Sequence, residues 1–389
     1  MAKRKEETID YCPQVTSRII LKEIQTELKK TKNSNTNILL SPLSFHAVLN
    51  MTAMLRFLGV RDINDLNSKF LNMSNVIEVI SNGGPDLSVL NGMWVAHTHE
   101  IRDSFKHLAT TLYKIEPKIV DFKLKQAVVK DVNTWAESAS KGLIKDILKP
   151  KNIRDNTKVL LANALYFKGT WNYDEERTID KYVYLLNGDK ISVPFMTGCD
   201  NFTYGSFEGY QVAKIPYEIG KNGDNKDFSM FIFLPNEKNG LPSLLEKVNS
   251  NPKFFTQKFN LWSVSVDAFC IPKFKFTYTA IKQVIRTMRE MGLTLPFDDN
   301  CMELTEIVKP EGPFFVNRIM QKAFIEVNEK GTEAAVTVVS DDDMGFSFRS
   351  PFLFMVREEV SRLVLFTGAV LNPSNCNSDT NSLSDSDDC

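Results

Sequence analysis

Histidines and acidic runs are the residues of this chain that come closest to forming a chemical site. The sequence contains four histidines, of which His97, His99 and His107 fall in one short segment. A zinc site needs a third protein ligand, and His97-Thr-His99 has none near it in sequence. The pattern therefore predicts a solvated loop and no metal site.

Three consecutive carboxylates, Asp341, Asp342 and Asp343, form a second candidate. Neighbouring side chains of an extended chain point to alternate sides, so these three cannot share one cation well, and we expect a solvated acidic loop. The sequence also has no Gly-x-Ser-x-Gly nucleophile elbow, no phosphate-binding glycine loop and no dinucleotide fingerprint. These observations predict a protein that is not an enzyme and that binds no cofactor.

The composition predicts a soluble chain with a large core. Of its 389 residues 43% are hydrophobic, and 47 basic side chains balance 48 acidic ones. A nucleic-acid binder would carry a clustered basic surplus, and a membrane helix would need about 20 apolar residues in a row, so we expect neither partner. The charged start, residues 1–7, lacks the apolar stretch of a signal peptide, and the six cysteines show no paired spacing. We expect a monomer in the cytoplasm, or in cytoplasm and nucleus, that reaches the outside only by leaderless release.

Helices are predicted early in the chain and strands later. Apolar spacing predicts a helix over residues 15–28, Ser41 and Pro42 suit the start of a second, and a third is expected over residues 133–148, ended by Pro150. Apolar runs predict buried strands over residues 159–167, 228–234, 264–271, 324–327, 352–356 and 361–370. This order predicts the α+β class with mixed sheets. Residues 374–389 are predicted to be a disordered acidic tail of Ser, Asn and Asp.

Several segments, taken in chain order, resemble one known family. They are Asn37-Ile-Leu-Leu-Ser41-Pro42-Leu-Ser44, Leu161-Ala-Asn163-Ala-Leu-Tyr166-Phe167-Lys168-Gly169-Thr-Trp171, Phe324–Ala335, Pro351-Phe-Leu-Phe354 and Leu365-Phe-Thr-Gly368. Together they are similar to the serpins, and to the plant-type serpin-Z branch most closely. The resemblance implies one serpin domain over residues 1–373, in which several helices pack on three mixed or antiparallel β-sheets.

The resemblance also implies a mechanism that depends on an exposed loop. In the family, a serine or cysteine endopeptidase cuts this reactive-centre loop, which then inserts as an extra strand into the main sheet. The match places the loop hinge at Glu329, Gly331, Thr332, Glu333, Ala334 and Ala335. It places the region where the sheet opens at Ser41, Pro42, Ser44, Asn163, Trp171 and Gln321. Gln321 stands where the family has a histidine, so a hydrogen bond near Asn163 can persist without the pH response of histidine.

The loop departs from the family pattern in length. Phe346–Pro351 aligns with the strand that receives the far end of the loop, which leaves Val336–Gly345, about ten residues fewer than in plant-type members. Complete insertion in the family uses roughly fourteen residues, the whole of Thr332–Gly345, at about 3.3 Å per residue. Insertion would also place Asp342 in the core, where an unpaired carboxylate is unfavourable. No length would then remain to hold a scissile bond in a protease cleft.

Two functions are compatible with these residues. The first is a non-inhibitory serpin, a binding or scaffold protein, and the shortened bait segment Asp341, Asp342, Asp343, Met344 and Gly345 favours it. The alternative is a suicide-substrate inhibitor of serine or cysteine endopeptidases, for which Met344-Gly345 is the bond that we nominate. A paired Phe346–Ser350 segment would preserve the shortage of loop residues, and a freely exposed one would restore the inhibitor interpretation.

Overall fold

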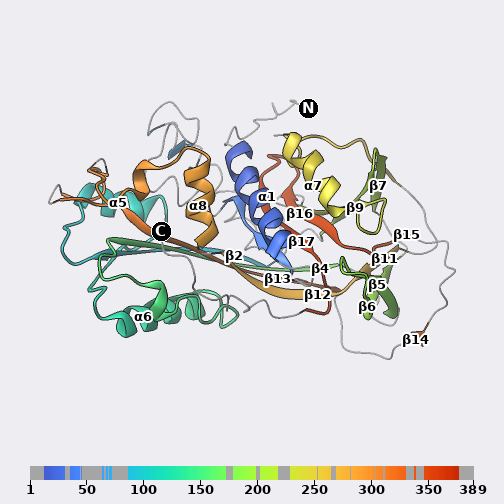
Figure 1. The fold of residues 1–389 in the computed structure, drawn as a ribbon, viewed down its shortest axis with the longest axis horizontal. Coiled ribbons are helices and arrows are strands. Elements are labelled where there is room, and N and C mark those ends of the chain that lie inside the picture. Colours follow the sequence, from blue (N-terminus) through green and yellow to red (C-terminus); the bar gives the residue numbers. More distant parts are fainter. Residues whose placement is uncertain are drawn as a thin grey trace, which may run out of the picture.

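The computed structural model contains three β-sheets with helices packed around them (Figure 1). The residues that it describes are 13–30, 36–43, 45, 64, 67–68, 70–71, 86–171, 178–198, 202–217, 228–251, 253–263, 269–280, 282–302, 304–309, 312–329, 337–338 and 346–375. Within these ranges, no helix combines the length and apolar content that a membrane span requires. The predicted α+β class with mixed and antiparallel sheets is confirmed.

The main sheet is mixed and has the strand order β12-β13-β4-β2-β3. Its strands are β2 (Asp86–Ala96), β3 (Lys118–Val120), β4 (Val159–Trp171), β12 (Phe274–Ala280) and β13 (Val316–Glu329). β4 and β13 pair in parallel, whereas β2 and β12 flank them in antiparallel orientation. The apolar run that predicts a buried strand over residues 159–167 therefore forms the centre of this sheet.

Helices lie on both faces of the main sheet. α6 (Lys125–Ala139) lies on one face, and α1 (Pro13–Lys30) and α8 (Lys282–Glu290) lie on the other (Figure 1). Successive side chains of a strand point to opposite faces. Ala162 and Ala164 of β4 accordingly join the small core beside Val128 of α6, whereas Leu161 and Leu165 join the larger core on the other side.

The second sheet is entirely antiparallel and lies behind the main one. Its order is β1 (Ile38–Leu40), β17 (Val364–Val370), β16 (Phe352–Glu358), β9 (Phe228–Pro235), β8 (Tyr210–Pro216), β7 (Thr203–Phe207) and β10 (Trp262–Ser263). Every residue of β9, β16 and β17 is buried, as their apolar runs predict. α7 (Leu241–Ser250) contacts β9, and α5 (Asp103–Thr111) lies at the far end of the molecule (Figure 1).

The third sheet is small and gathers both ends of the predicted loop. Its order is β14 (Thr337–Val338), β5 (Ile179–Tyr184), β6 (Lys190–Gly198), β11 (Phe269–Pro272) and β15 (Phe346–Ser347). β14 pairs in parallel with β5 at one edge, and β15 pairs in parallel with β11 at the other. Two short segments that follow β13 therefore form the two outer strands of one sheet.

The predicted helix over residues 133–148 was wrong at both ends. α6 starts at Lys125 and ends at Ala139, because Lys141 and Gly142 take up left-handed backbone conformations and the Gly142 N–H bonds the Glu137 carbonyl. Pro150 opens a short 3-10 helix, η1 (Pro150–Asn152), and does not end an α-helix. The apolar residues after Ala139 still reach the core, which explains why their spacing suggested a longer helix.

The prediction of a solvated loop at His97 and His99 was wrong for one of the two. His97 is exposed and lies 3.8 Å from an Asp121 carboxylate oxygen. His99 is buried, packs against the Phe314 ring and exchanges a 2.9 Å hydrogen bond with the Thr98 hydroxyl. Among the described residues no group of three or more His, Cys, Asp or Glu side chains could hold a metal ion.

Candidate functional site

The candidate site is the seam between β4 and β13 in the main sheet. The two strands pair from Val316 opposite Val159 to Glu329 opposite Trp171, with a bulge between Val316 and Arg318. Their direct pairing leaves no strand between them. The pairing is parallel, and parallel pairing is slightly less stable per residue than antiparallel pairing.

A buried polar cluster lies behind the middle of the seam. The backbone N–H of Ser41 donates to Gln321 Oε1 at 3.0 Å, and Gln321 Nε2 donates back to the Ser41 carbonyl at 3.2 Å. The Ser41 hydroxyl donates to the Leu365 carbonyl at 2.6 Å, which links β13 through Ser41 to β17. Gln321 and Ser41 are at most 1% exposed. The cluster therefore connects one side of the seam to the second sheet through neutral hydrogen bonds.

Asn163 lies directly opposite Gln321 in the register of the seam. Its amide Nδ2 donates to Asn91 Oδ1 on β2 at 2.6 Å, so this side chain turns away from β13. Its Oδ1 atom is buried and has no hydrogen-bond partner among the described residues. Among the described residues no hydrogen bond joins these two side chains across the seam, and each bonds groups on its own side.

Aromatic rings fill the end of the seam where both strands finish. Trp171, the last residue of β4, is buried and stacks on Tyr217 with ring centroids 5.4 Å apart. Phe167 meets the edge of the same Tyr217 ring at 5.2 Å. Burial raises the pKa of Tyr217 well above its usual value, so this hydroxyl stays protonated at physiological pH. The packing holds this end of β4 against the molecule's core.

α6 is attached to the other face of the main sheet by one carboxylate. Asp131 Oδ2 accepts a 2.6 Å hydrogen bond from the Trp94 indole, and Asp131 Oδ1 accepts a 2.7 Å bond from Lys118. Partial burial opposes ionisation, but these two hydrogen bonds and the Lys118 charge outweigh it, so the pKa of Asp131 lies below its usual value. The helix is therefore fixed to β2 and β3, and does not bond β13 through this residue.

The chain that follows the seam is held in the small sheet. Phe346 pairs with Phe269 of β11, and the Phe348 N–H donates to the Cys270 carbonyl at 3.2 Å. The Phe348 side chain is fully buried. The Tyr184 N–H donates to the Arg349 carbonyl at 2.8 Å. Residues 346–349 are thus bonded to β11 and to the end of β5 in the small sheet.

The structure places only some of the predicted site residues. Asn163, Trp171 and Gln321 lie on the two strands of the seam, Ser41 bonds Gln321, and the backbone of Glu329 ends β13. These residues other than Glu329, together with Pro42, are buried. The remaining predicted site residues lie outside the described residues, as do residues 376–389 of the predicted tail. They are Ser44, Gly331, Thr332, Glu333, Ala334, Ala335, Asp341, Asp342, Asp343, Met344 and Gly345.

Sequence reasoning missed several partners of the predicted residues. Asn91, Leu365 and Tyr217 contact the seam residues from strands or turns far away in the sequence. No spacing rule connects positions that are this distant. The contacts depend on how strands are ordered in the sheets, which the apolar runs alone do not specify.

Comparisons with known proteins match this geometry. A family model described as Serpin (serine protease inhibitor) matches residues 23–373. Serpin-Z10 of Arabidopsis thaliana is 39% identical over 375 residues, with 88% of this chain and 94% of that protein covered. Serpin-ZX of the same plant is 35% identical over 373 residues, with the same coverage.

One solved structure resembles the fold over nearly its whole length. It is the native stressed conformation of Arabidopsis AtSerpin1, with a TM-score of 0.82 and 34% sequence identity, covering 96% of this chain and 100% of that one. The sheets, the seam and the matched family model lead to the same assignment. This chain belongs to the serpin family.

Proposed function

We propose that this serpin is a binding protein that does not trap proteases. The observation that carries the proposal is the pairing of Phe346 with β11, which limits the chain between β13 and β15 to residues 330–345. Within this segment Thr337 and Val338 pair with β5, and insertion would have to break that pairing. In the mechanism of inhibitory serpins, one loop must first bind the protease as a substrate and then insert into the main sheet as a new strand. The sixteen residues between β13 and β15 supply one of these roles at a time.

The seam sets the length that insertion requires. A strand that fills it must match β4, which has 13 residues. It would run antiparallel to β13, so the chain first needs a turn, and the shortest hairpin turns use about two residues. About one residue is then left between the end of the new strand and Phe346. The cut bond would have to lie at Met344-Gly345, directly beside a strand already paired.

A protease cleft also needs accessible chain after the cut bond. Proteases hold their substrates extended over several residues, with backbone hydrogen bonds on both sides. After Met344-Gly345 the chain enters β15, and Phe348 is fully buried. A protease could engage this side only after β15 left β11. That step adds a free-energy cost to the formation of any complex, because it breaks the pairing of β15 with β11 and exposes the Phe348 ring.

The acidic run opposes insertion in either register. Both faces of β4 are buried, since alternate residues belong to the two cores. A strand next to β4 would place Asp342 toward one core and Asp341 and Asp343 toward the other. A buried unpaired carboxylate costs several kcal/mol or must bind a proton. No register therefore keeps all three carboxylates in water.

The inhibitor function is the second candidate, and one observation favours it. β4 and β13 are paired directly with no inserted strand, and the similar AtSerpin1 structure is described as native and stressed. A closed seam is the state from which insertion would start. Under this alternative Met344-Gly345 is the scissile bond and a serine or cysteine endopeptidase is the partner.

Incubation with a panel of serine and cysteine endopeptidases tests the proposal. We expect clean cleavage within residues 330–345 or no reaction, and no complex that survives boiling in detergent. A matched variant carries ten extra Ser, Ala and Gly residues between Asp343 and Met344, and it shows whether length alone limits trapping. A covalent complex formed by the unmodified protein would overturn the proposal. A large rise in melting temperature after loop cleavage would also count against it, because insertion adds a strand to the main sheet.

A further inference from the structure

A basic pocket opens at the end of the main sheet where β4 and β13 begin. It has a volume of 630 Å³ and lies between the segment after η1, the last turns of α8, the short 3-10 helix η3 (Leu295–Phe297), and the start of β13. This volume is within the usual range for small-molecule sites in proteins, about 300–1,000 Å³. The pocket is at the opposite end of the strands from Trp171 and Glu329.

Four arginines line this pocket: Arg154, Arg286, Arg289 and Arg318. The lining also includes two carboxylates, Asp299 and Glu290, but Glu290 is already paired with Arg286 at 3.3 Å and with Lys22. Cations therefore outnumber carboxylates around the cavity, although the whole chain has a net charge of −1. A local excess of this kind in a nearly neutral protein attracts an anion.

Two of the guanidinium groups are held in place by neutral acceptors. Arg318 Nε donates to the Asn152 carbonyl at 2.9 Å, and Arg289 Nη2 donates to the Phe297 carbonyl at 2.6 Å. A carbonyl fixes the orientation of a guanidinium without neutralising its charge, and each guanidinium keeps further N–H donors. Preorganised guanidinium groups bind phosphate or carboxylate oxygens through paired hydrogen bonds, and lose little side-chain entropy when they do so.

Arg154 and Arg318 are like charges brought together by the fold. Burial lowers the pKa of Arg318, and the nearby Arg154 charge lowers it further. No carboxylate pairs with either residue within the described ranges of the chain. An anion placed between the two would remove this repulsion. The apolar wall of the pocket, which includes the buried rings of Phe297 and Phe315, could hold an uncharged part of the same ligand.

We propose that this pocket binds a small molecule that carries two or more phosphate groups. Several guanidinium groups around one cavity can each contact a different phosphate oxygen. A single small anion is too small to contact all of them at once. The cavity can hold a molecule the size of a nucleotide or a sugar phosphate. The inference does not depend on the length of the loop, and it holds whether or not the protein traps proteases.

The position of the pocket gives the ligand an effect on the seam. Arg154 precedes β4, whereas Arg318 belongs to β13, so a ligand that contacts both connects the two strands. The bulge residue Asn317 already joins them, because its Oδ1 accepts hydrogen bonds from the Lys158 N–H at 2.6 Å and the Val159 N–H at 3.4 Å. The bound ligand would strengthen this junction and favour the closed seam.

Calorimetric titration of the full chain tests the proposal. The probes are inorganic tripolyphosphate and magnesium-free ATP, with sulfate and citrate at equal ionic strength as comparisons. We expect the phosphate probes to bind at least about tenfold more tightly than sulfate. Arg154→Gln and Arg286→Gln should each weaken this binding by about tenfold, the effect of one charge-assisted contact. Lys253→Gln removes the same charge from an exposed residue after α7, outside the pocket, and should leave the affinity unchanged.

Hydrogen exchange provides a second readout that does not depend on the variants. Bound tripolyphosphate should slow exchange of the amides at the start of β4 and β13, and leave β16 and β17 unchanged. The proposal would be overturned if neither phosphate probe binds at millimolar concentration, or if Lys253→Gln weakens binding as much as Arg154→Gln. Binding of a long sulfated polysaccharide without binding of the small probes would also reject it, because that result indicates an extended surface.

Discussion

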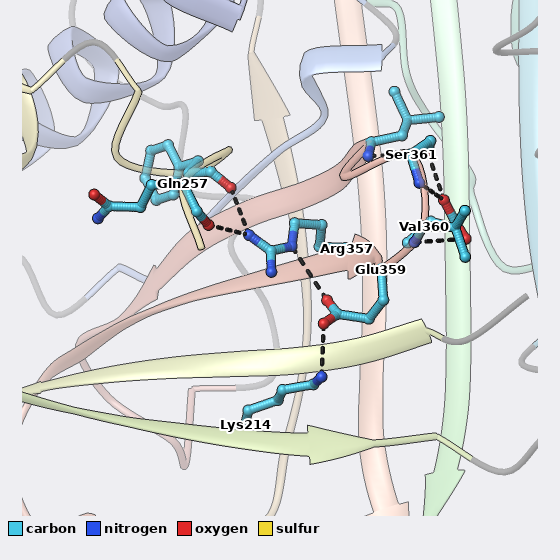
Figure 2. Close-up of polar contacts among 9 residues, drawn as sticks. Lys214, Gln257, Arg357, Glu359, Val360 and Ser361 are labelled. Carbon is cyan, nitrogen blue, oxygen red and sulfur yellow. Dashed lines mark hydrogen bonds and ion pairs between the residues drawn. The ribbon is translucent and has the colours of Figure 1, made fainter. Parts of the chain in front are cut away.

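The protein contains two buried polar clusters that are built in opposite ways. One lies at the hairpin between β16 and β17 and is centred on Arg357 (Figure 2). The other is the Ser41 and Gln321 cluster behind the seam. The hairpin cluster consists of charged groups, whereas the seam cluster consists of neutral amides and backbone groups. The two clusters therefore differ in the strength of the hydrogen bonds that hold them.

In the hairpin cluster, each of the four charged side chains has a partner. Arg357 Nη1 donates to the carbonyls of Phe255 and Gln257 at 3.2 and 2.9 Å, and its Nε donates to Glu359 Oε1 at 3.2 Å. The other Glu359 oxygen lies 2.6 Å from Lys214 on β8 (Figure 2). Glu358 accepts hydrogen bonds from the N–H groups of Val360 and Ser361, and from the Ser361 hydroxyl. These contacts connect β16, β8 and the segment after α7.

The seam cluster is less completely bonded. Gln321 and Ser41 satisfy each other, but the Asn163 Oδ1 atom opposite has no partner among the described residues. Neutral hydrogen bonds contribute about 0.5–1.5 kcal/mol each, and those with charged groups about 1.5–3 kcal/mol. The hairpin cluster therefore contains the stronger kind of hydrogen bond, and the seam cluster the weaker kind.

The largest expected effect is on the hairpin cluster. Arg357→Ala should lower the free energy of unfolding by about 3–5 kcal/mol, because it removes a buried guanidinium that bonds Glu359 and the carbonyls of Phe255 and Gln257. Urea denaturation followed by fluorescence measures the loss. Lys214→Gln is the matched control, since Glu359 keeps Arg357 and the loss should be about 1 kcal/mol. Equal losses in the two variants would show that the buried guanidinium has no special role.

The sequence predicted elements where the apolar pattern is continuous. The runs over residues 159–167, 228–234, 352–356 and 361–370 each became a strand at the centre of a sheet, because burial on both faces leaves no polar alternation to confuse the pattern. The family segments located Asn163, Trp171 and Gln321 along the seam. The helix after residue 133 failed because two left-handed residues end α6 early, and the apolar spacing does not record backbone conformation.

Contacts between distant parts of the chain could not be predicted in the same way. Gln321 was expected to keep a hydrogen bond near Asn163, and the sequence did not indicate that its partner is the Ser41 backbone, which a different strand order would not have placed there. The arginines of the basic pocket come from three separate segments and carry no common motif. The burial of Arg357 could not be predicted from the sequence either, because an Arg-Glu-Glu run is most often exposed.

The seam cluster should respond less strongly to substitution. Gln321→Ala removes the two hydrogen bonds between the Gln321 amide and the buried Ser41 backbone, and should cost about 1–3 kcal/mol of stability. Thr277→Ala on β12 is a control at a half-buried position of the same sheet, and a loss below about 0.5 kcal/mol is expected there. Hydrogen exchange sharpens the comparison, because Gln321→Ala should speed exchange in β4 and β13 while β16 and β17 keep their protection. Faster exchange in both sheets would mean that the two clusters belong to one cooperative unit.

The smallest effect is expected where α6 meets the main sheet. The pKa of Asp131 lies below its usual value, so the folded state favours the ionised carboxylate. Its contribution is present above the unfolded pKa of about 3.9, and is lost as the pH falls through the lower folded value. The side chain is 39% exposed, so Asp131→Asn should cost less than about 1 kcal/mol at neutral pH. Urea titrations at neutral and strongly acidic pH should show this cost shrinking in acid, because both proteins then carry an uncharged group at position 131. If the cost stays constant across that range, it comes from the geometry of the Trp94 hydrogen bond, and the charge of Asp131 makes no contribution to stability.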